Sequence, residues 1–60
     1  MRAYSLTELM NLTRNELFVL HRQIADALAL LPEGSAERDV AFANLRNIRR
    51  VLARREFAPS

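Results

Sequence analysis

The sequence predicts an all-α protein with a short N-terminal helix and a long antiparallel helical hairpin that dimerises into a four-helix bundle. Three observations predict this fold. The chain of 60 residues has one Gly and two Pro, which argues against the turn-rich sequence of an all-β fold. Two Ser/Thr-x-x-Glu motifs mark the starts of helices. Two long runs with helical apolar periodicity flank Pro-Glu-Gly-Ser at positions 32–35.

The two capping motifs begin at Ser5 and at Thr13. In this motif the hydroxyl accepts from the backbone N–H three residues on, and the Glu there accepts from the N–H of the cap. We therefore expect one helix over 6–12 and a second over 14–31. A single bent helix over 6–31 is the alternative, and the second motif favours the break.

The Pro-Glu-Gly-Ser segment separates the second helix from the third. Pro32 disfavours helical geometry at the residue before it, Gly34 permits a positive φ, and Ser35 is a good N-cap. The predicted segments are helix 6–12, helix 14–31, turn 32–35, helix 36–55 and a frayed tail over 56–60, in one domain over 1–60.

The apolar periodicity predicts which helix faces are buried. The second helix carries a stripe of coiled-coil type made of Leu17, Leu20, Ile24, Ala27, Leu28 and Leu31, and the third carries a matching stripe of Ala41, Leu45, Ile48 and Leu52. Helix 6–12 carries further apolar residues, and it can fold back over part of the apolar surface that the two stripes leave uncovered.

More apolar residues remain than one hairpin can cover. Monomers seldom expose large contiguous apolar patches, so a second copy is the expected cover. The candidate dimer-interface residues are Phe18, Val19, Leu30, Phe42 and Val51.

Size and composition limit both stability and chemistry. A chain of this size buries only about 60% of the surface that its unfolded form exposes. With no Cys and a single His, it has neither disulfides nor a structural zinc site to compensate. It also has no thiol nucleophile, no Gly-rich phosphate loop and no second His for a relay. We expect no catalytic site, no cofactor, no metal and no small-molecule substrate.

No apolar run approaches the roughly 18 residues of a membrane span, and the N-terminus lacks the apolar core of a signal peptide. We therefore expect a cytoplasmic protein without a membrane partner.

The charges are unevenly distributed along the chain. Positions 1–39 hold four Arg against six acidic residues, whereas positions 40–60 hold five Arg against one Glu. Helical spacing places Arg46, Arg50 and Arg54 in one row, with Arg49 beside it. Guanidinium groups bind phosphates and carboxylates well, so this row is a candidate nucleic-acid or acidic-protein ridge. A solvated face with cations near a helix C-terminus is the alternative.

Part of the pattern resembles a known family. The residues are Glu16-Leu17-Phe18-x-Leu20-x-x-Gln23 and Leu45-Arg46-x-Ile48-Arg49-Arg50-x-Leu52-x-Arg54. They resemble the bacterial ribosomal protein that forms a short helical hairpin near the exit tunnel of the large subunit. The resemblance implies that the four Arg would contact ribosomal RNA. The chain departs from that family in having no Lys, a net charge of only +2 and a different turn, and we do not assign it there.

We therefore expect a non-catalytic helical interaction module or small regulator that self-associates and docks on a protein partner. The alternative is a nucleic-acid-binding hairpin that uses the Arg ridge. The sequence does not indicate which partner or pathway is involved.

Overall fold

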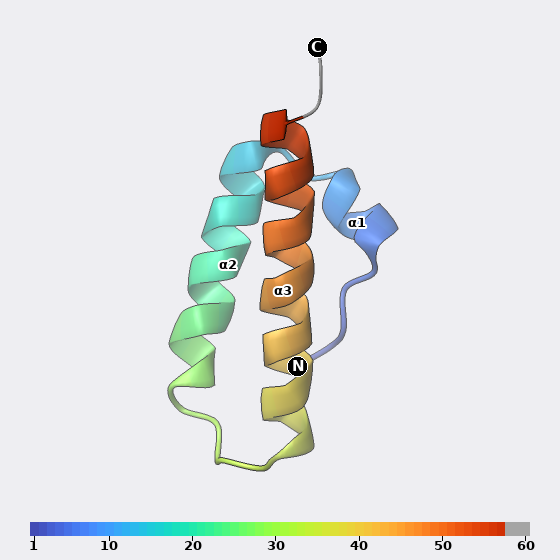
Figure 1. The fold of residues 1–60 in the computed structure, drawn as a ribbon. Helices are drawn as coiled ribbons and strands as arrows, with labels where there is room; N and C mark the ends of the chain where they lie inside the picture. The colour runs from blue at the N-terminus through green and yellow to red at the C-terminus, as the bar shows by residue number, and fades with distance from the viewer. Residues whose placement is uncertain (58–60) are drawn as a thin grey trace.

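The computed structural model describes the backbone of residues 1–57 and the side chains of residues 1–55. Three helices form this part of the chain, and it contains no strand: α1 (Leu6–Met10), α2 (Arg14–Leu28) and α3 (Ala36–Phe57). The prediction of an all-α protein is confirmed. α3 is the central element, because α2 packs along one side of it and α1 packs on another (Figure 1).

Both predicted capping boxes form. The Ser5 hydroxyl accepts from the Glu8 N–H at 3.1 Å, and the Glu8 carboxylate accepts from the Ser5 N–H at 3.3 Å. Thr13 and Glu16 form the equivalent bonds at 3.1 and 2.9 Å. Thr13 has an extended backbone, with φ −70° and ψ 164°. The chain is therefore broken between α1 and α2, and the alternative of one bent helix is wrong.

The ends of the first two helices differ from the predicted bounds. α1 ends at Met10 instead of residue 12, and α2 ends at Leu28 instead of residue 31. After α2 the N–H groups of Leu30 and Leu31 bond to the carbonyls three residues earlier, at 3.0 and 3.2 Å. This tighter turn follows from Pro32, because a residue before proline disfavours α-helical geometry.

The predicted turn has the expected chemistry. Gly34 has a φ of +77°, and the Ser35 hydroxyl accepts from the Arg38 N–H at 3.2 Å to cap α3. α3 runs to Phe57, two residues beyond the predicted end at 55. The predicted fraying of 56–60 is therefore wrong for the backbone of 56 and 57, and positions 58–60 lie outside the described residues.

The core is one cluster shared by all three helices. Both predicted stripes contribute to it, and α1 adds Leu9, which is fully buried. Tyr4 and several leucines pack around the cluster, whose buried members are Leu9, Leu17, Ile24, Ala41, Leu45, Ile48, Val51 and Leu52.

A buried asparagine attaches the N-terminal segment to α3. Asn44 is only 1% exposed. Its Oδ1 accepts from the Tyr4 N–H at 2.9 Å, and its Nδ2 donates to the Arg2 carbonyl at 2.9 Å. Both bonds join residues about 40 positions apart in the chain. The side chain therefore bonds to the backbone of residues 2 and 4 and fixes the position of the segment that precedes α1.

Replacement of Asn44 by Ala is expected to destabilise the protein. The substitution removes both bonds and leaves a small cavity, so we expect a loss of about 1–3 kcal/mol in the free energy of unfolding. Urea denaturation measures this loss. Asn47→Ala, on the same helix and partly exposed, is the matched control and should change stability by less than about 0.5 kcal/mol. Equal effects of the two substitutions would contradict the role given to Asn44.

Stability should also fall at acid pH. The Arg2 guanidinium, 2.7 Å from the Glu8 carboxylate, and the Ser5 backbone N–H lower the pKa of Glu8. The Thr13 backbone N–H and hydroxyl lower the pKa of Glu16. A carboxyl with a lower pKa in the folded chain stabilises it above the unfolded pKa, and this contribution is lost as pH falls through the folded value.

We therefore expect the melting temperature to drop as the pH falls below about 4.3, the ordinary value for Glu. Glu8→Gln and Glu16→Gln should each flatten this dependence, because Gln keeps the capping bond but does not titrate. Thermal melts of the wild type and of each variant, recorded between neutral and acid pH, measure this pH dependence of the melting temperature. Glu33→Gln, in the exposed turn, is the control, and a comparable flattening by this variant would refute the assignment.

Candidate functional site

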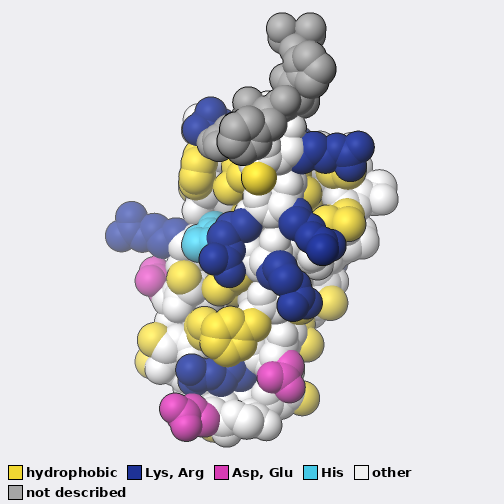
Figure 2. Space-filling view, in the orientation of Figure 1, with side chains coloured by type: hydrophobic (Ala, Val, Ile, Leu, Met, Phe, Trp, Pro, Cys, Tyr) yellow, Lys and Arg dark blue, Asp and Glu magenta, His cyan; other side chains and the backbone are white. Residues whose placement is uncertain are grey.

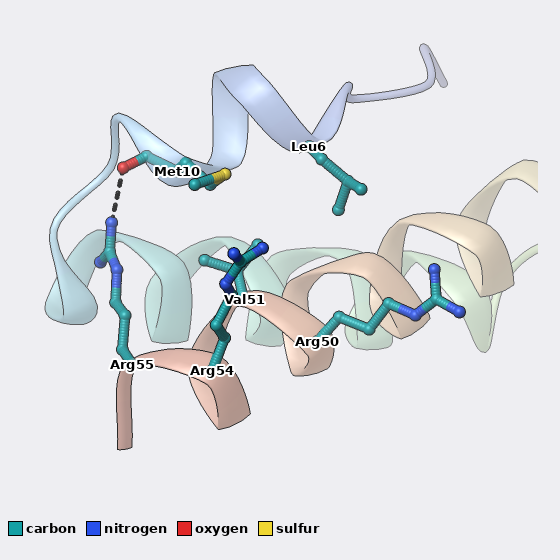
Figure 3. Close-up of a pocket in the computed structure, with 6 residues that line it drawn as sticks. All are labelled: Leu6, Met10, Arg50, Val51, Arg54 and Arg55. Atoms are coloured by element: carbon teal, nitrogen blue, oxygen red, sulfur yellow. Dashed lines mark hydrogen bonds between the residues drawn. The ribbon is translucent and has the colours of Figure 1, made fainter. Parts of the chain in front are cut away.

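A groove lies between α1 and α3 near the C-terminal end of α3 (Figure 3). Its volume is about 480 Å³, and its lining combines apolar and basic side chains: Leu6, Met10, Arg50, Val51, Arg54 and Arg55. The helical spacing of α1 creates it. Leu9 faces α3 and is fully buried, while Leu6 and Met10, four positions apart, lie together on the neighbouring side of α1 and stay about half exposed.

One arginine of the groove holds α1 in place. The Arg55 Nη2 donates to the Met10 carbonyl at 2.6 Å (Figure 3). Carbonyls in the last turn of a helix have no partner within the helix, so this bond satisfies a group that would otherwise need water. The bond closes one end of the groove and fixes the C-terminal end of α1 against α3.

The other two guanidinium groups of the groove are available to a ligand. Within residues 1–55, neither Arg50 nor Arg54 has a hydrogen-bond or ion-pair partner. Arg54 lies beside Val51 and below Met10, and Arg50, from the preceding turn of α3, extends along the helix away from Arg54 (Figure 3). The site therefore offers two cations next to apolar surface, which suits an anion attached to an apolar body.

The structure divides the predicted Arg ridge into two surfaces. All four ridge residues are exposed, as a binding role requires. Arg50 and Arg54 border the groove beside α1. Arg46 and Arg49 lie four and seven positions after Phe42, which places all three on one stripe of α3 that runs beside the groove and does not line it.

An aromatic ring belongs to this second surface, although the Arg row contains none in sequence. Phe42 is about half exposed, and the Arg38 guanidinium carbon lies 5.5 Å from its ring centroid. Basic side chains surround a hydrophobic patch over α3 in Figure 2. We call the set Arg38, Phe42, Arg46 and Arg49 the basic stripe.

The candidate dimer residues fall into two groups. Phe18, Val19 and Phe42 are about half exposed and Leu30 is 86% exposed, so their side chains offer surface to a partner. Val51 is only 5% exposed, because α1 lies over that side of α3. Its selection as an interface residue is corrected accordingly, since it belongs to the core and lines the groove.

The exposed residues of α2 point in different directions. Val19 lies on one side of α2, and Leu30 lies beyond the end of α2, in the turn that follows Leu28. Phe18 lies on another side, where the Arg14 guanidinium carbon is 5.4 Å from its ring centroid. A second copy on the Val19 side would therefore leave the basic stripe open.

Three features of the site were missed in the sequence. The groove and the Arg55 bond depend on where α1 packs, and no local pattern signals them. The sequence does give a sign of Asn44, because this polar residue lies three positions after Ala41 and four before Ile48, on the side of α3 that the apolar stripe predicts to be buried.

Neither a metal-binding cluster nor a membrane-spanning helix occurs within the described part of the chain. No group of three or more acidic or His side chains within it could hold a metal ion. None of its helices has the length and apolar character needed to cross a membrane.

Comparison with protein-family models, with curated proteins and with solved structures finds no match to this chain.

Proposed function

We propose that this chain is a non-catalytic helical interaction module in which α2 and α3 act as an antiparallel hairpin. The hairpin self-associates as a homodimer, forming a four-helix bundle from the long helices of two copies, and docks on a protein partner. The composition supports the non-catalytic part of the proposal, because a chain with no Cys and one His has few groups for catalysis.

One observation carries the proposal: large apolar side chains remain exposed although the core is complete without them. Val19 is 56% exposed on α2, and Leu30, in the turn that follows α2, is 86% exposed. The Val19 side of α2 also carries Arg22 and Asp26, three and seven positions after Val19, so charges of both signs lie there and repulsion between the like charges of two copies is limited. Burial against a second chain would supply apolar contacts that a 60-residue chain otherwise lacks.

Replacement of Leu30 by Glu tests self-association. Leu30 makes few contacts within its own chain, so the substitution should leave the monomer fold intact. A charge buried at the dimer interface would dissociate the dimer and lower the melting temperature, because folding is coupled to association. Sedimentation equilibrium at micromolar concentration measures the mass.

Ala29→Glu is the matched control, since it places the same charge one residue away on an exposed position. We expect the wild type and Ala29→Glu to sediment as dimers and Leu30→Glu as a monomer. A wild type that sediments at 6.9 kDa with a cooperative melt would refute the dimer.

The basic stripe supports a second candidate function, the binding of single-stranded nucleic acid. Arg46 and Arg49 have no hydrogen-bond or ion-pair partner within residues 1–55, and Phe42 offers a half-exposed ring beside them. The Arg38 guanidinium, in contrast, donates to the Leu31 carbonyl at 3.2 Å. Nucleic-acid-binding grooves combine basic side chains that follow the phosphates with aromatic rings on which bases stack.

The salt dependence of binding tests this second candidate. If Arg46 and Arg49 neutralise phosphates, the logarithm of the affinity for a labelled single strand should fall linearly with the logarithm of the salt concentration. Each Arg→Ala change should reduce the slope by about 0.7. Phe42→Ala should weaken binding without changing the slope, because stacking releases no counterion. Arg22→Ala on α2 is the control, and fluorescence anisotropy without micromolar binding at low salt would exclude this function.

A further inference from the structure

The groove between α1 and α3 has two chemical halves. Leu6, Met10 and Val51 supply apolar surface, and Met10 is 51% exposed although it lines the groove. Arg50 and Arg54 border this surface with guanidinium groups that have no partner within residues 1–55. A ligand that fills the groove must therefore carry both apolar groups and negative charge.

The spacing of the two arginines specifies how that charge is arranged. Arg50 and Arg54 are four positions apart on α3, which separates them by about 6 Å along the helix axis. Two carboxylates at positions i and i+4 of another helix have the same separation. The Arg54 guanidinium lies beside Val51, whereas the exposed Arg50 side chain extends along α3 away from it (Figure 3). A helix lying along α3 could therefore pair one carboxylate with Arg54 and, once the Arg50 side chain turns toward the groove, a second with Arg50, while its neighbouring apolar residues contact Leu6 and Met10.

We propose that this groove is the docking site for an acidic amphipathic helix of another protein. The ligand has Asp or Glu residues one turn apart beside an apolar stripe, and its apolar side chains lie against Leu6, Met10 and Val51. Helix-in-groove binding is a common mode of peptide recognition. The proposal rests on the protein-docking function given above, but it does not require the dimer.

A second copy of this chain does not supply such a helix. Glu8 in α1, Glu16 and Asp26 in α2, and Glu37 and Asp39 in α3 are not three or four positions apart within any helix. Nucleic acid is also a poor fit, because phosphates would pair with the arginines and leave Leu6 and Met10 exposed. The groove lining contains no aromatic ring for base stacking.

The groove is formed before any ligand binds. The Ser5–Glu8 capping box fixes the start of α1, and the Arg55 bond to the Met10 carbonyl fixes its end. Little ordering of the backbone would then accompany binding, which favours affinity from a small contact area.

Three synthetic helical peptides of about 16 residues, long enough to form measurable helix, test the proposal by fluorescence anisotropy. The first has a Leu stripe beside a pair of Glu four residues apart. The second has the same composition with the Leu residues scattered around the helix, and the third has Lys in place of Glu. We expect micromolar binding of the first peptide at about 150 mM salt, and at least about tenfold weaker binding of the other two, equivalent to one decade in Kd.

Variants of the protein locate the binding surface. Arg50→Glu, Arg54→Glu and Met10→Glu should each weaken binding of the first peptide by about tenfold or more. Arg22→Glu and Ala29→Glu, which place Glu at exposed positions away from the groove, are the controls and should change it by less than about twofold. Far-UV circular dichroism checks that each variant is folded. The double variant Arg50→Glu/Arg54→Glu should instead bind the Lys peptide.

Amide chemical shifts of ¹⁵N-labelled protein distinguish the outcomes. Changes in amide chemical shift on addition of the first peptide that are concentrated at Leu6, Met10 and Val51 support the proposal. Shifts at Phe18 and Phe42 instead would overturn this site while leaving a protein-docking function in place. Absence of binding by the first peptide overturns the inference, and sedimentation of the same sample then tests self-association separately. Tighter binding of a labelled single-stranded oligonucleotide that is lost in Arg54→Glu would assign the groove to phosphate and also overturn the proposal.

Discussion

The burial of two sides of α3 is the constraint on which the rest of the structure depends. α3 contributes five of the eight buried apolar residues and also the buried Asn44, and both other helices pack against it. α2 covers one edge of its apolar stripe, and Leu9 of α1 covers the other together with the N-terminal segment held by Asn44. α2 and α3 alone would leave Val51 partly open on that second edge. The short N-terminal helix therefore completes the core.

The same packing determines which surfaces are available for binding. Because α1 lies over Val51, the arginines at 50 and 54 become the border of a groove, while those at 46 and 49 remain on an open stripe with Phe42. Arg55, the next residue along, is used inside the chain to fix α1. The arginines of α3 thus have three different environments: the border of the groove, the open stripe beside Phe42, and the hydrogen bond to α1. The proposed protein-docking and nucleic-acid surfaces differ for that reason, and each has its own set of side chains.

Local chemistry explains the parts of the fold that could be predicted from sequence. Both capping boxes involve residues three positions apart, so Ser5, Glu8, Thr13 and Glu16 specify the helix starts without any tertiary contact. Pro32 and Gly34 specify the turn in the same way. The ends of α1 and α2 were less predictable, because they depend on which N–H groups donate hydrogen bonds to the last carbonyls of each helix. The bond from the Leu31 N–H to the Leu28 carbonyl replaces a helical turn that apolar periodicity alone would have continued.

The sequence by itself therefore determined the all-α class, the three helices, their starts and the two apolar stripes, because caps, turns and periodicity act over three to seven residues. Only the tertiary structure decided that Val51 is core, that Asn44 bonds to the chain near Arg2 and Tyr4, and that the Arg row is divided. These features depend on contacts between residues some 40 positions apart. Such contacts arise where α1 lies on α3, and side-chain packing across two helices sets that position without leaving a periodic signal in either one.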